Sequence, residues 1–277
     1  MTTKPSIDLG PSLVSSPTGR LRAAALVSPS AAIVRARAMP GEPAPVFSRA
    51  LEQHQILRAT LQYFGVETWV MPPADDPYAA AAADAAIVFE TGAAIARPTS
   101  MARRAEADRM RTEFARIGVN VLATVAAPGL FDGSDLLLAA GTAFVGVGAR
   151  GNELGREQIS AIAVAQGYRV VRVRLAADVP SLRAVASAVA SDTVVIAHDR
   201  LDASAFAGFA TIVLERGEDF AAGVLCIGER HVVADARYRT ALSQMRKERI
   251  VVEAIDLYDF TKAGLTASQL VLPLQRT

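Results

Sequence analysis

The chain has 277 residues, enough for one larger α/β domain with a sizeable core, and 51% of them are hydrophobic. Its 29 Lys and Arg residues against 28 Asp and Glu residues leave a formal net charge of +1, which argues against a nucleic acid or a membrane surface as partner. The single cysteine excludes an internal disulfide framework and a cysteine-rich metal cluster, and it fits a cytoplasmic protein.

Residues 1–22 are expected to form a flexible N-terminal leader ahead of one domain over residues 23–277. Prolines and charged residues interrupt the leader, so it lacks the continuous apolar core of a signal peptide. The longest uncharged apolar stretch lies between Asp135 and Arg150, short of the ~20 residues that a membrane helix needs. The sequence therefore predicts neither a signal peptide nor a membrane span.

One pattern recurs along the chain, in which an amphipathic helix ends at a glycine or a charged turn and leads into an apolar strand. The helices of this pattern are expected to end at Gly65, Gly118, Gly167 and near Arg249. The strands that follow them are expected over residues 66–70, 119–122, 170–173 and 250–252. Further apolar runs predict strands over residues 86–89, 143–146, 193–196 and 211–214. Such recurrence favours a repeated α/β architecture.

A dinucleotide-binding sheet is the rival interpretation. Residues 146–151 read Gly-Val-Gly-Ala-Arg-Gly, follow an apolar run and precede a helix, which is the context of a phosphate-binding loop. That fold also needs an acidic residue ~20 positions further on, and the region holds Arg169, Arg172 and Arg174 instead. We therefore expect no nucleotide cofactor.

Four segments carry a resemblance to a known family. Residues 84–91 read Asp-Ala-Ala-Ile-Val-Phe-Glu-Thr, and residues 131–137 read Phe-Asp-Gly-Ser-Asp-Leu-Leu. Residues 144–152 read Phe-Val-Gly-Val-Gly-Ala-Arg-Gly-Asn, and residues 259–266 read Asp-Phe-Thr-Lys-Ala-Gly-Leu-Thr. In this order they resemble the dimethylarginine dimethylaminohydrolase and arginine deiminase group of the guanidino-group-modifying (pentein) superfamily. The resemblance implies an α/β fold, a five-bladed α/β propeller with pseudo-fivefold repeats.

The resemblance also implies a pocket for a small amino-acid-like ligand. Asp84 and Glu90 would lie near the site of a cationic group, while the family's other carboxylate at this strand falls on Phe89. Arg103 and Arg150 fall where the family grips a substrate carboxylate, and an arginine fork binds a planar carboxylate through two hydrogen bonds. We therefore expect Asp84, Glu90, Arg103 and Arg150 to form a ligand pocket.

Both catalytic positions of the family are altered. The family attacks an amidino carbon with a cysteine thiolate, assisted by a histidine that acts as acid and base. Its Gly-Leu-Thr-Cys reads Gly-Leu-Thr-Ala here, which places Ala267 at the nucleophile position. The closest alignment puts Asp178 at the histidine position, uncertain by a residue or two, and no histidine lies nearby. We therefore assign no catalytic residue.

Other candidate groups have simpler interpretations. Cys226 lies in an apolar run, where a buried cysteine is usually inert. Ser268 would need a neighbouring base to act as a nucleophile. His198 and His231 are typical of strand ends or turns, and nothing in the sequence indicates a metal site.

Three hypotheses for function remain. The leading one is a catalytically impaired homologue, a pseudoenzyme that binds an arginine-like amino acid in a binding or regulatory role. The alternative is a hydrolase or related enzyme on guanidino or other amino-acid substrates, using Asp178, Glu90 or Ser268 without a thiolate. The third is a propeller scaffold for protein interaction, since a fold does not fix a function. The sequence identifies neither the ligand nor the oligomeric state, and a homo-oligomer stays open.

Overall fold

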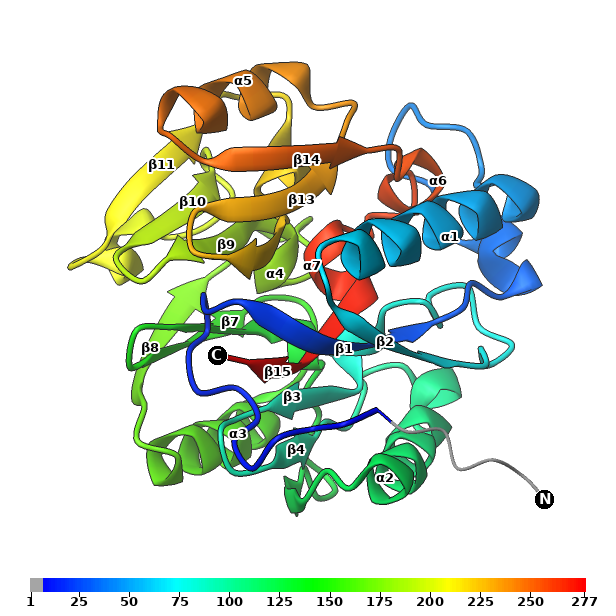
Figure 1. Ribbon diagram of the computed structural model, residues 1–277, viewed down its shortest axis with the longest axis vertical. Coiled ribbons are helices and arrows are strands. Elements are labelled where there is room, and N and C mark those ends of the chain that lie inside the picture. The colour runs from blue at the N-terminus through cyan, green and yellow to red at the C-terminus, as the bar shows by residue number, and fades with distance from the viewer. Residues whose placement is uncertain (1–6) are drawn as a thin grey trace.

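The structure is a computed structural model that describes residues 7–277, and these residues form five three-stranded sheets. Every sheet is built in the same way: an inner strand pairs antiparallel with a central strand, which pairs parallel with an outer strand. The sheets surround a common centre, and the long helices α1, α2, α3 and α5 lie on the outside (Figure 1). The predicted five-bladed α/β propeller is therefore confirmed.

In four blades the inner, central and outer strands follow one another along the chain, and in the first blade the inner strand comes from the C-terminal end instead. In the first blade these are β15 (Val271–Arg276), β1 (Leu21–Val27) and β2 (Glu67–Met71), with α1 (Phe47–Tyr63) before β2. In the second they are β3 (Ala86–Val88), β4 (Ala93–Ile95) and β5 (Val121–Thr124), with α2 (Ala105–Ile117) before β5. In the third they are β6 (Leu136–Ala139), β7 (Thr142–Val147) and β8 (Arg169–Arg174), with α3 (Glu153–Ala165) before β8.

The remaining two blades follow the same order. In the fourth blade the strands are β9 (Ala186–Ala190), β10 (Thr193–Ala197) and β11 (Ala210–Leu214), joined by the short η5 (Ala203–Phe206). In the fifth they are β12 (Leu225–Gly228), β13 (His231–Asp235) and β14 (Val251–Ile255), with α5 (Arg239–Lys247) before β14. Three further short helices lie in the connections: η1 (Ala31–Arg35), η3 (Met101–Arg103) and α6 (Tyr258–Thr261).

A short helix precedes every inner strand, and these five helices lie at the same end of the propeller. They are η2 (Ala82–Asp84), η4 (Gly133–Asp135), α4 (Leu182–Val185), η6 (Asp219–Ala222) and α7 (Ala267–Leu270). The repeat therefore places one short helix per blade at equivalent positions around the centre.

The predicted helix ends are confirmed. Gly65, Gly118 and Gly167 all have φ near +80°, which glycine adopts without the steric cost of a Cβ atom. Arg249 takes the same left-handed conformation, with φ of 62°, at the end of α5. Each of these turns redirects the chain from an outer helix into the next strand.

The first blade joins the two ends of the described chain. β1 pairs antiparallel with β15, from Leu21 opposite Arg276 to Leu26 opposite Val271. Leu13 and Val14 are buried, so the prediction of a flexible leader does not hold for this part. The Leu13 amide donates to the carbonyl of Glu90 over 2.9 Å, which ties the segment to the second blade. The first six residues of the predicted leader lie outside the described residues.

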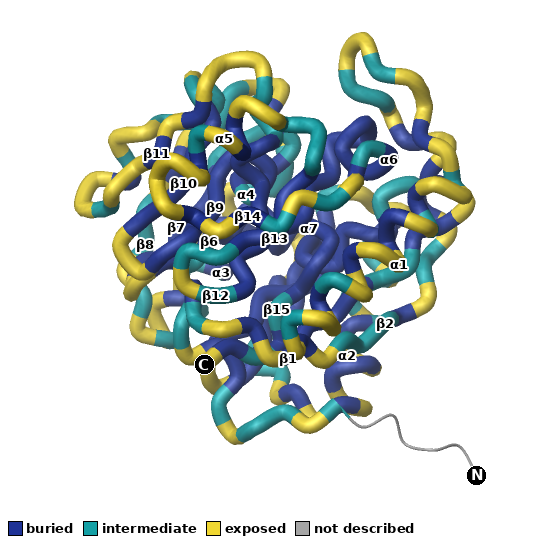
Figure 2. The backbone as a smooth tube through the Cα atoms, turned by 45° about the horizontal axis from the view of Figure 1, so that its top comes forward, coloured by how far each residue is buried: buried dark blue, intermediate teal, exposed yellow. Residues whose placement is uncertain are grey.

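The hydrophobic core is divided among the spaces between neighbouring blades. Figure 2 shows the buried backbone gathered toward the middle of the molecule and the exposed backbone at its rim. In one cluster Phe144 of the third blade stacks against Phe206, which follows the fourth blade's central strand, with ring centroids 4.5 Å apart. Burying a side chain of this size stabilises the fold by roughly 1.5–3 kcal/mol. Adjacent blades are thus held together by shared side-chain packing.

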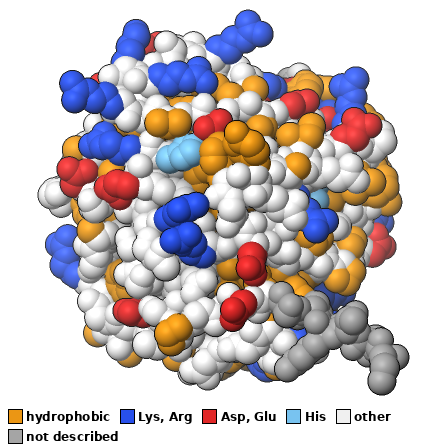
Figure 3. Space-filling view, viewed as in Figure 1, with side chains coloured by type: hydrophobic (Ala, Val, Ile, Leu, Met, Phe, Trp, Pro, Cys, Tyr) orange, Lys and Arg blue, Asp and Glu red, His pale blue; other side chains and the backbone are white. Residues whose placement is uncertain are grey.

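The surface seen from the side of Figure 1 carries both signs of charge, interspersed among apolar and uncharged groups (Figure 3). Within residues 7–277, no helix is both long and apolar enough to cross a membrane.

Candidate functional site

The candidate site lies where four of the short helices meet. η2 packs against η4 and α7, and α4 packs against the same two helices. Residues that are 50 to 185 positions apart in the sequence are thereby brought to one end of the inner strands. The site is consequently built from four different blades.

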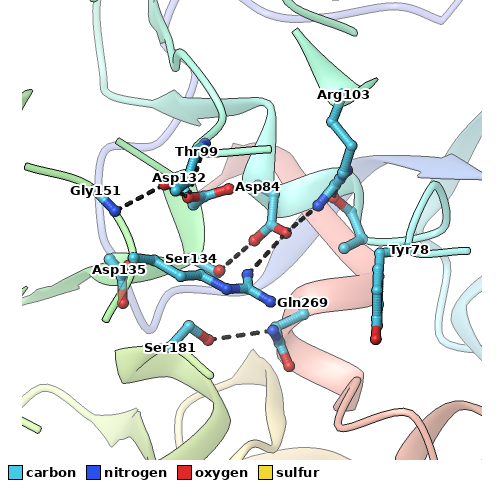
Figure 4. Close-up of polar contacts among 12 residues, drawn as sticks. Tyr78, Asp84, Thr99, Arg103, Asp132, Ser134, Asp135, Gly151, Ser181 and Gln269 are labelled. Atoms are coloured by element: carbon cyan, nitrogen blue, oxygen red, sulfur yellow. Dashed lines mark hydrogen bonds and ion pairs between the residues drawn. The ribbon is translucent and has the colours of Figure 1, made fainter. Parts of the chain in front are cut away.

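Asp84, the last residue of η2, is the centre of the charged cluster. Its carboxylate is fully buried and lies 2.6 Å from Nη1 of Arg103 and 3.3 Å from Nη1 of Arg150. The hydroxyl of Ser134 donates to the other carboxylate oxygen (Figure 4). Burial alone would raise the pKa of Asp84, but the two guanidinium groups and the Ser134 hydroxyl hold it below the usual value. The structure thus brings together three of the four predicted pocket residues.

Arg103 is held on several sides. Its side chain is 3% exposed, and its Nε and Nη2 atoms lie 3.0 and 2.8 Å from the two carboxylate oxygens of Glu106. Burial by itself would lower the pKa of Arg103, but the carboxylates of Asp84 and Glu106 raise it. Burial raises the pKa of Glu106. Arg103 is therefore a fixed cation whose guanidinium N–H groups already donate to the carboxylates of Asp84 and Glu106.

Arg150 is the more accessible of the two arginines, because its side chain is 25% exposed. It lies just beyond β7 and is followed by Gly151, which has φ of 72°. A Cβ atom on Gly151 would lie 2.9 Å from the carbonyl oxygen of Leu130, so glycine is required by both conformation and space. The Gly151 amide donates to the hydroxyl oxygen of Thr99 over 2.7 Å. This turn fixes where the Arg150 side chain begins.

Two more carboxylates surround the cluster. Asp132 accepts the Thr99 hydroxyl over 2.6 Å and the Thr99 amide over 3.2 Å. Asp135 accepts the Leu182 amide over 3.0 Å. Burial raises the pKa of both, and it raises the pKa of Asp135 to about 8, so this carboxyl group is mostly protonated at neutral pH. The Asp135 amide also donates to the carbonyl oxygen of Asp132 over 2.9 Å, which closes the turn before β6.

The short helix α7 places Ala267 beside this cluster. Ala267 is 3% exposed, and α7 packs against η2, which ends at Asp84. A capping box between Thr266 and Gln269 holds the start of the helix, and Nε2 of Gln269 donates to the Ser181 hydroxyl over 3.2 Å. The backbone at the predicted nucleophile position is therefore ordered, and its side chain is a methyl group.

The alternative nucleophiles are not activated. The Ser268 hydroxyl donates to the carbonyl oxygen of Arg183 over 2.7 Å and has no hydrogen bond to a histidine or a carboxylate within residues 7–277. Cys226 is buried, its sulfur lies 3.1 Å from the carbonyl oxygen of Gly228, and burial raises the pKa of its thiol. A thiol with a raised pKa is a poor nucleophile at neutral pH.

The three histidines are engaged elsewhere. Burial lowers the pKa of His54, in α1, to about 4. His198 lies beside Asp199, and Nε2 of His231 lies 2.9 Å from a carboxylate oxygen of Glu253. None of them hydrogen-bonds to Asp84, Arg103 or Arg150 among the described residues.

Glu90 does not join the charged cluster, which corrects the prediction that it shares a pocket with Asp84. Its side chain is exposed and accepts the Ser12 hydroxyl over 3.1 Å. Strand β3 separates Asp84 at its start from Phe89 and Glu90 beyond its end. Phe89 is fully buried against Tyr168, with ring centroids 6.0 Å apart, so it adds no accessible apolar surface to the site.

Asp178 also faces away from the cluster. Its carboxylate is 70% exposed and lies 3.0 Å from Nη1 of Arg200, which in turn binds Asp219 over 2.7 Å. These residues line a separate surface pocket together with Arg237 and Tyr238. Asp178 is thus a surface ion-pair partner, three residues before Ser181, which does contact α7 through Gln269.

Several site residues were not predicted as such. Ser134 lies within the family-like segment 131–137 but was not singled out, and Thr99, Ser181 and Gln269 carry no recognisable sequence signal. Their roles depend on contacts between blades, which a linear pattern does not show. Within residues 7–277 no group of three or more His, Cys, Asp or Glu side chains is placed to hold a metal ion.

No family model matches the chain. Curated relatives do: an N(G),N(G)-dimethylarginine dimethylaminohydrolase of Streptomyces coelicolor is 35% identical over 218 residues, which cover 77% of this chain and 81% of that protein. The enzyme of the same name from Pseudomonas aeruginosa is 25% identical over 219 residues, covering 79% of this chain and 85% of that protein.

Solved structures agree on the fold. A mutant of the Pseudomonas aeruginosa dimethylarginine dimethylaminohydrolase, complexed with citrulline, superposes with a TM-score of 0.82 at 22% identity, covering 91% of this chain and 99% of that chain. The N-terminal domain of a cyanobacterial arginine dihydrolase, bound to its substrate, gives 0.80 at 19% identity, covering 92% and 98%. An amidinotransferase from Microseira wollei gives 0.80 at 14% identity, covering 96% and 98%.

Proposed function

The chain belongs to the dimethylarginine dimethylaminohydrolase family, and from this premise we propose that it is a catalytically impaired member that binds an arginine-like amino acid. The observation that carries the proposal is the buried cluster of Asp84, Arg103 and Arg150 beside a methyl group at position 267. Groups that hold a zwitterion are present there, and a group that attacks it is not.

The ligand's carboxylate would bind Arg150. A guanidinium has five N–H donors, and the Arg150 side chain makes one ion pair, with Asp84, while keeping a quarter of its surface accessible. Arg103 is a poorer first contact, because Glu106 and Asp84 occupy its donors. We therefore assign Arg150 as the docking cation and Arg103 as the group that fixes Asp84 in place.

The ligand's cationic group would bind the carboxylates. The arginines hold Asp84 in its ionised form. Asp132 lies close enough to Asp84 for the negative charge there to raise the pKa of Asp132. A ligand that brings its own carboxylate to Arg150 and a positive group to Asp84 and Asp132 would satisfy both signs without leaving a buried charge unpaired. The Pseudomonas relative in complex with citrulline supports a ligand of this size and backbone.

Impaired catalysis follows from what surrounds Ala267. A methyl side chain forms no covalent intermediate, and neither Ser268 nor Cys226 has a base that would activate it. The non-thiolate alternative would need Asp178 or Glu90 at the cluster, but these carboxylates engage Arg200 and Ser12 instead. No observation favours that alternative or the scaffold hypothesis over ligand binding.

Isothermal titration with L-arginine, N-methylarginine and L-citrulline tests this proposal. We expect weak, saturable binding in the wild type and a loss of about 10- to 100-fold in affinity in Arg150→Ala, the range for one charge-assisted contact. Arg111→Ala is the matched control, because Arg111 makes only exposed contacts, with Asp108 on α2 and Thr124 on β5, and its loss should leave affinity unchanged. The absence of heat and of a thermal shift with all three ligands at millimolar concentration would contradict the proposal.

A further inference from the structure

The inner strands enclose a channel that the proposed ligand site does not use. Residues of all five inner strands line it, among them Ile87, Leu137, Ala188, Leu225 and Leu272. Its cavity volume is about 90 Å³. Gly133 of η4 and Ser268 of α7 line it where the short helices begin. The channel is therefore the axis of the propeller, with mostly apolar walls.

Two arginines also line this channel, and nothing assigned so far explains them. Arg183 comes from α4 in the fourth blade, and Arg276 comes from the end of β15 in the first. Arg276 is 4% exposed, and Arg183 is half-buried with its remaining surface on the channel. Buried arginines in proteins are normally paired with a carboxylate.

Neither of these arginines has such a partner within residues 7–277. Arg276 donates to the carbonyl oxygens of Gly19 and Cys226 over 2.9 and 2.6 Å, and Arg183 donates to that of Ser268. Burial and, to a smaller extent, the positive charge of Arg276 lower the pKa of Arg183 to about 10. Asp84 acts in the opposite direction, but it is already paired with two other arginines.

The unused donors of Arg183 face space rather than side chains. Its Nε and Nη1 atoms make no hydrogen bond to residues 7–277, and neither atom is fully buried. Nitrogen atoms without a protein acceptor and without full burial must face the accessible space beside them, here the channel. The channel is thus lined by two positive charges that keep N–H donors without a protein acceptor.

We propose that the axial channel binds a small oxyanion through Arg183 and Arg276. The planar guanidinium fork matches two oxygens of a phosphate, sulfate or carboxylate group, which a spherical halide cannot satisfy as well. Apolar walls on the other sides strengthen the attraction by excluding water and limit the ligand to a small one. This site is separate from the cluster at Asp84 and does not depend on the proposed function.

Inorganic phosphate is the probe, tested by thermal unfolding and by titration calorimetry at constant ionic strength. We expect a saturable rise in Tm, about 5 °C when phosphate exceeds its Kd 100-fold. Sulfate and acetate distinguish a general oxyanion site from one selective for phosphate, and sodium chloride should have little effect. A rise that grows linearly with salt and is the same for all anions would be the general exclusion effect and would overturn the proposal.

Arg183→Met keeps the length of the side chain and removes its charge. We expect this variant to lose at least nine-tenths of the phosphate affinity, and to unfold at a higher temperature than the wild type in phosphate-free buffer because one repulsion is gone. Arg216→Met is the matched control, since Arg216 is 76% exposed and pairs only with Asp199 on the surface. If Arg183→Met does not fold, wild-type calorimetry still decides, because a merely hydrated arginine pair gives no saturable heat with phosphate.

Discussion

The candidate site has two unlike halves. η2 and η4 contribute the carboxyl groups of Asp84 and Asp135 and the hydroxyl of Ser134, whereas α7 places the methyl group of Ala267 at the predicted nucleophile position. The short helices hold equivalent places in the pseudo-fivefold repeat, so the halves differ chiefly in the side chains that they carry at these places. The charged groups and the predicted nucleophile position therefore lie on different blades and can change independently.

The two halves also differ in how strongly they are tied to stability. The charges of the first half form one interlocked network in which every buried group needs its partners. The second half is held by a capping box and by hydrogen bonds to main-chain carbonyls, none of which involves the Ala267 side chain. The fold therefore does not depend on which side chain stands at position 267, whereas loss of a charge from the first half is expected to destabilise it.

The largest effect is expected from Asp84→Ala. Removing this carboxylate leaves Arg103 and Arg150 without their shared buried partner, and breaking a buried ion pair from one side costs about 3–5 kcal/mol in the free energy of unfolding. Urea denaturation measures the change. Asp75→Ala removes an exposed partner of Arg35 and should stay within about 0.5 kcal/mol. A loss below about 1 kcal/mol in Asp84→Ala would show that the network is not interlocked.

Asp135→Asn should change the pH dependence of stability. The folded protein raises the pKa of Asp135 to about 8 from its usual 3.8, so the folded state favours the protonated form. This contribution is complete below pH ~4 and declines as pH rises toward 8, by up to about 1.4 kcal/mol for each pH unit. Asparagine keeps the acceptor for the Leu182 amide and cannot ionise. The free energy of unfolding of the variant should therefore change less with pH over this range. Parallel stability profiles of variant and wild type would refute the shifted pKa.

Ser268→Ala should cost about 1 kcal/mol, since it removes one hydrogen bond to the Arg183 carbonyl. Because Ser268 belongs to the second half of the site, ligand affinity should not change. Ser204→Ala, at an exposed hydroxyl that bonds Asp202, is the control for losing a surface contact. Abolition of a measurable activity by Ser268→Ala alone would instead identify this hydroxyl as a nucleophile.

The smallest effect is expected from Ala267→Cys. The added sulfur supplies a cysteine at the predicted nucleophile position, but no histidine within residues 7–277 hydrogen-bonds to a residue of α7 to activate it. We expect turnover of N-methylarginine to stay at the buffer blank, measured by citrulline formation. Rapid turnover in this single variant would mean that the rest of the catalytic machinery is intact.

Local signals explain which parts of the fold could be predicted from sequence. Glycines at 65, 118 and 167 ended the helices because their left-handed conformation is a property of one residue. The pairing of β15 with β1 joins residues 245 to 255 positions apart, and the burial of Leu13 depends on a neighbouring blade, so no local pattern indicates either. Closure of the ring could thus be inferred only from the family resemblance.

The site was predictable to a similar degree. Asp84, Arg103 and Arg150 were predicted from the family resemblance, and they do meet. Glu90 was misplaced because its position was judged by closeness in sequence, although a strand carries the chain away from the site between Asp84 and Glu90. Thr99 and Gln269 act through hydrogen bonds to other blades, so only the three-dimensional structure reveals them.

The central claim, binding without turnover, is tested most directly by following both quantities in one sample. Wild-type protein is titrated calorimetrically with N-methylarginine, and the same cell contents are assayed for citrulline after a long incubation. We predict a saturable binding isotherm together with citrulline at the level of the buffer blank. Citrulline formed in many equivalents per protein chain would contradict the account, because it would require a nucleophile and a base that the second half of the site does not provide.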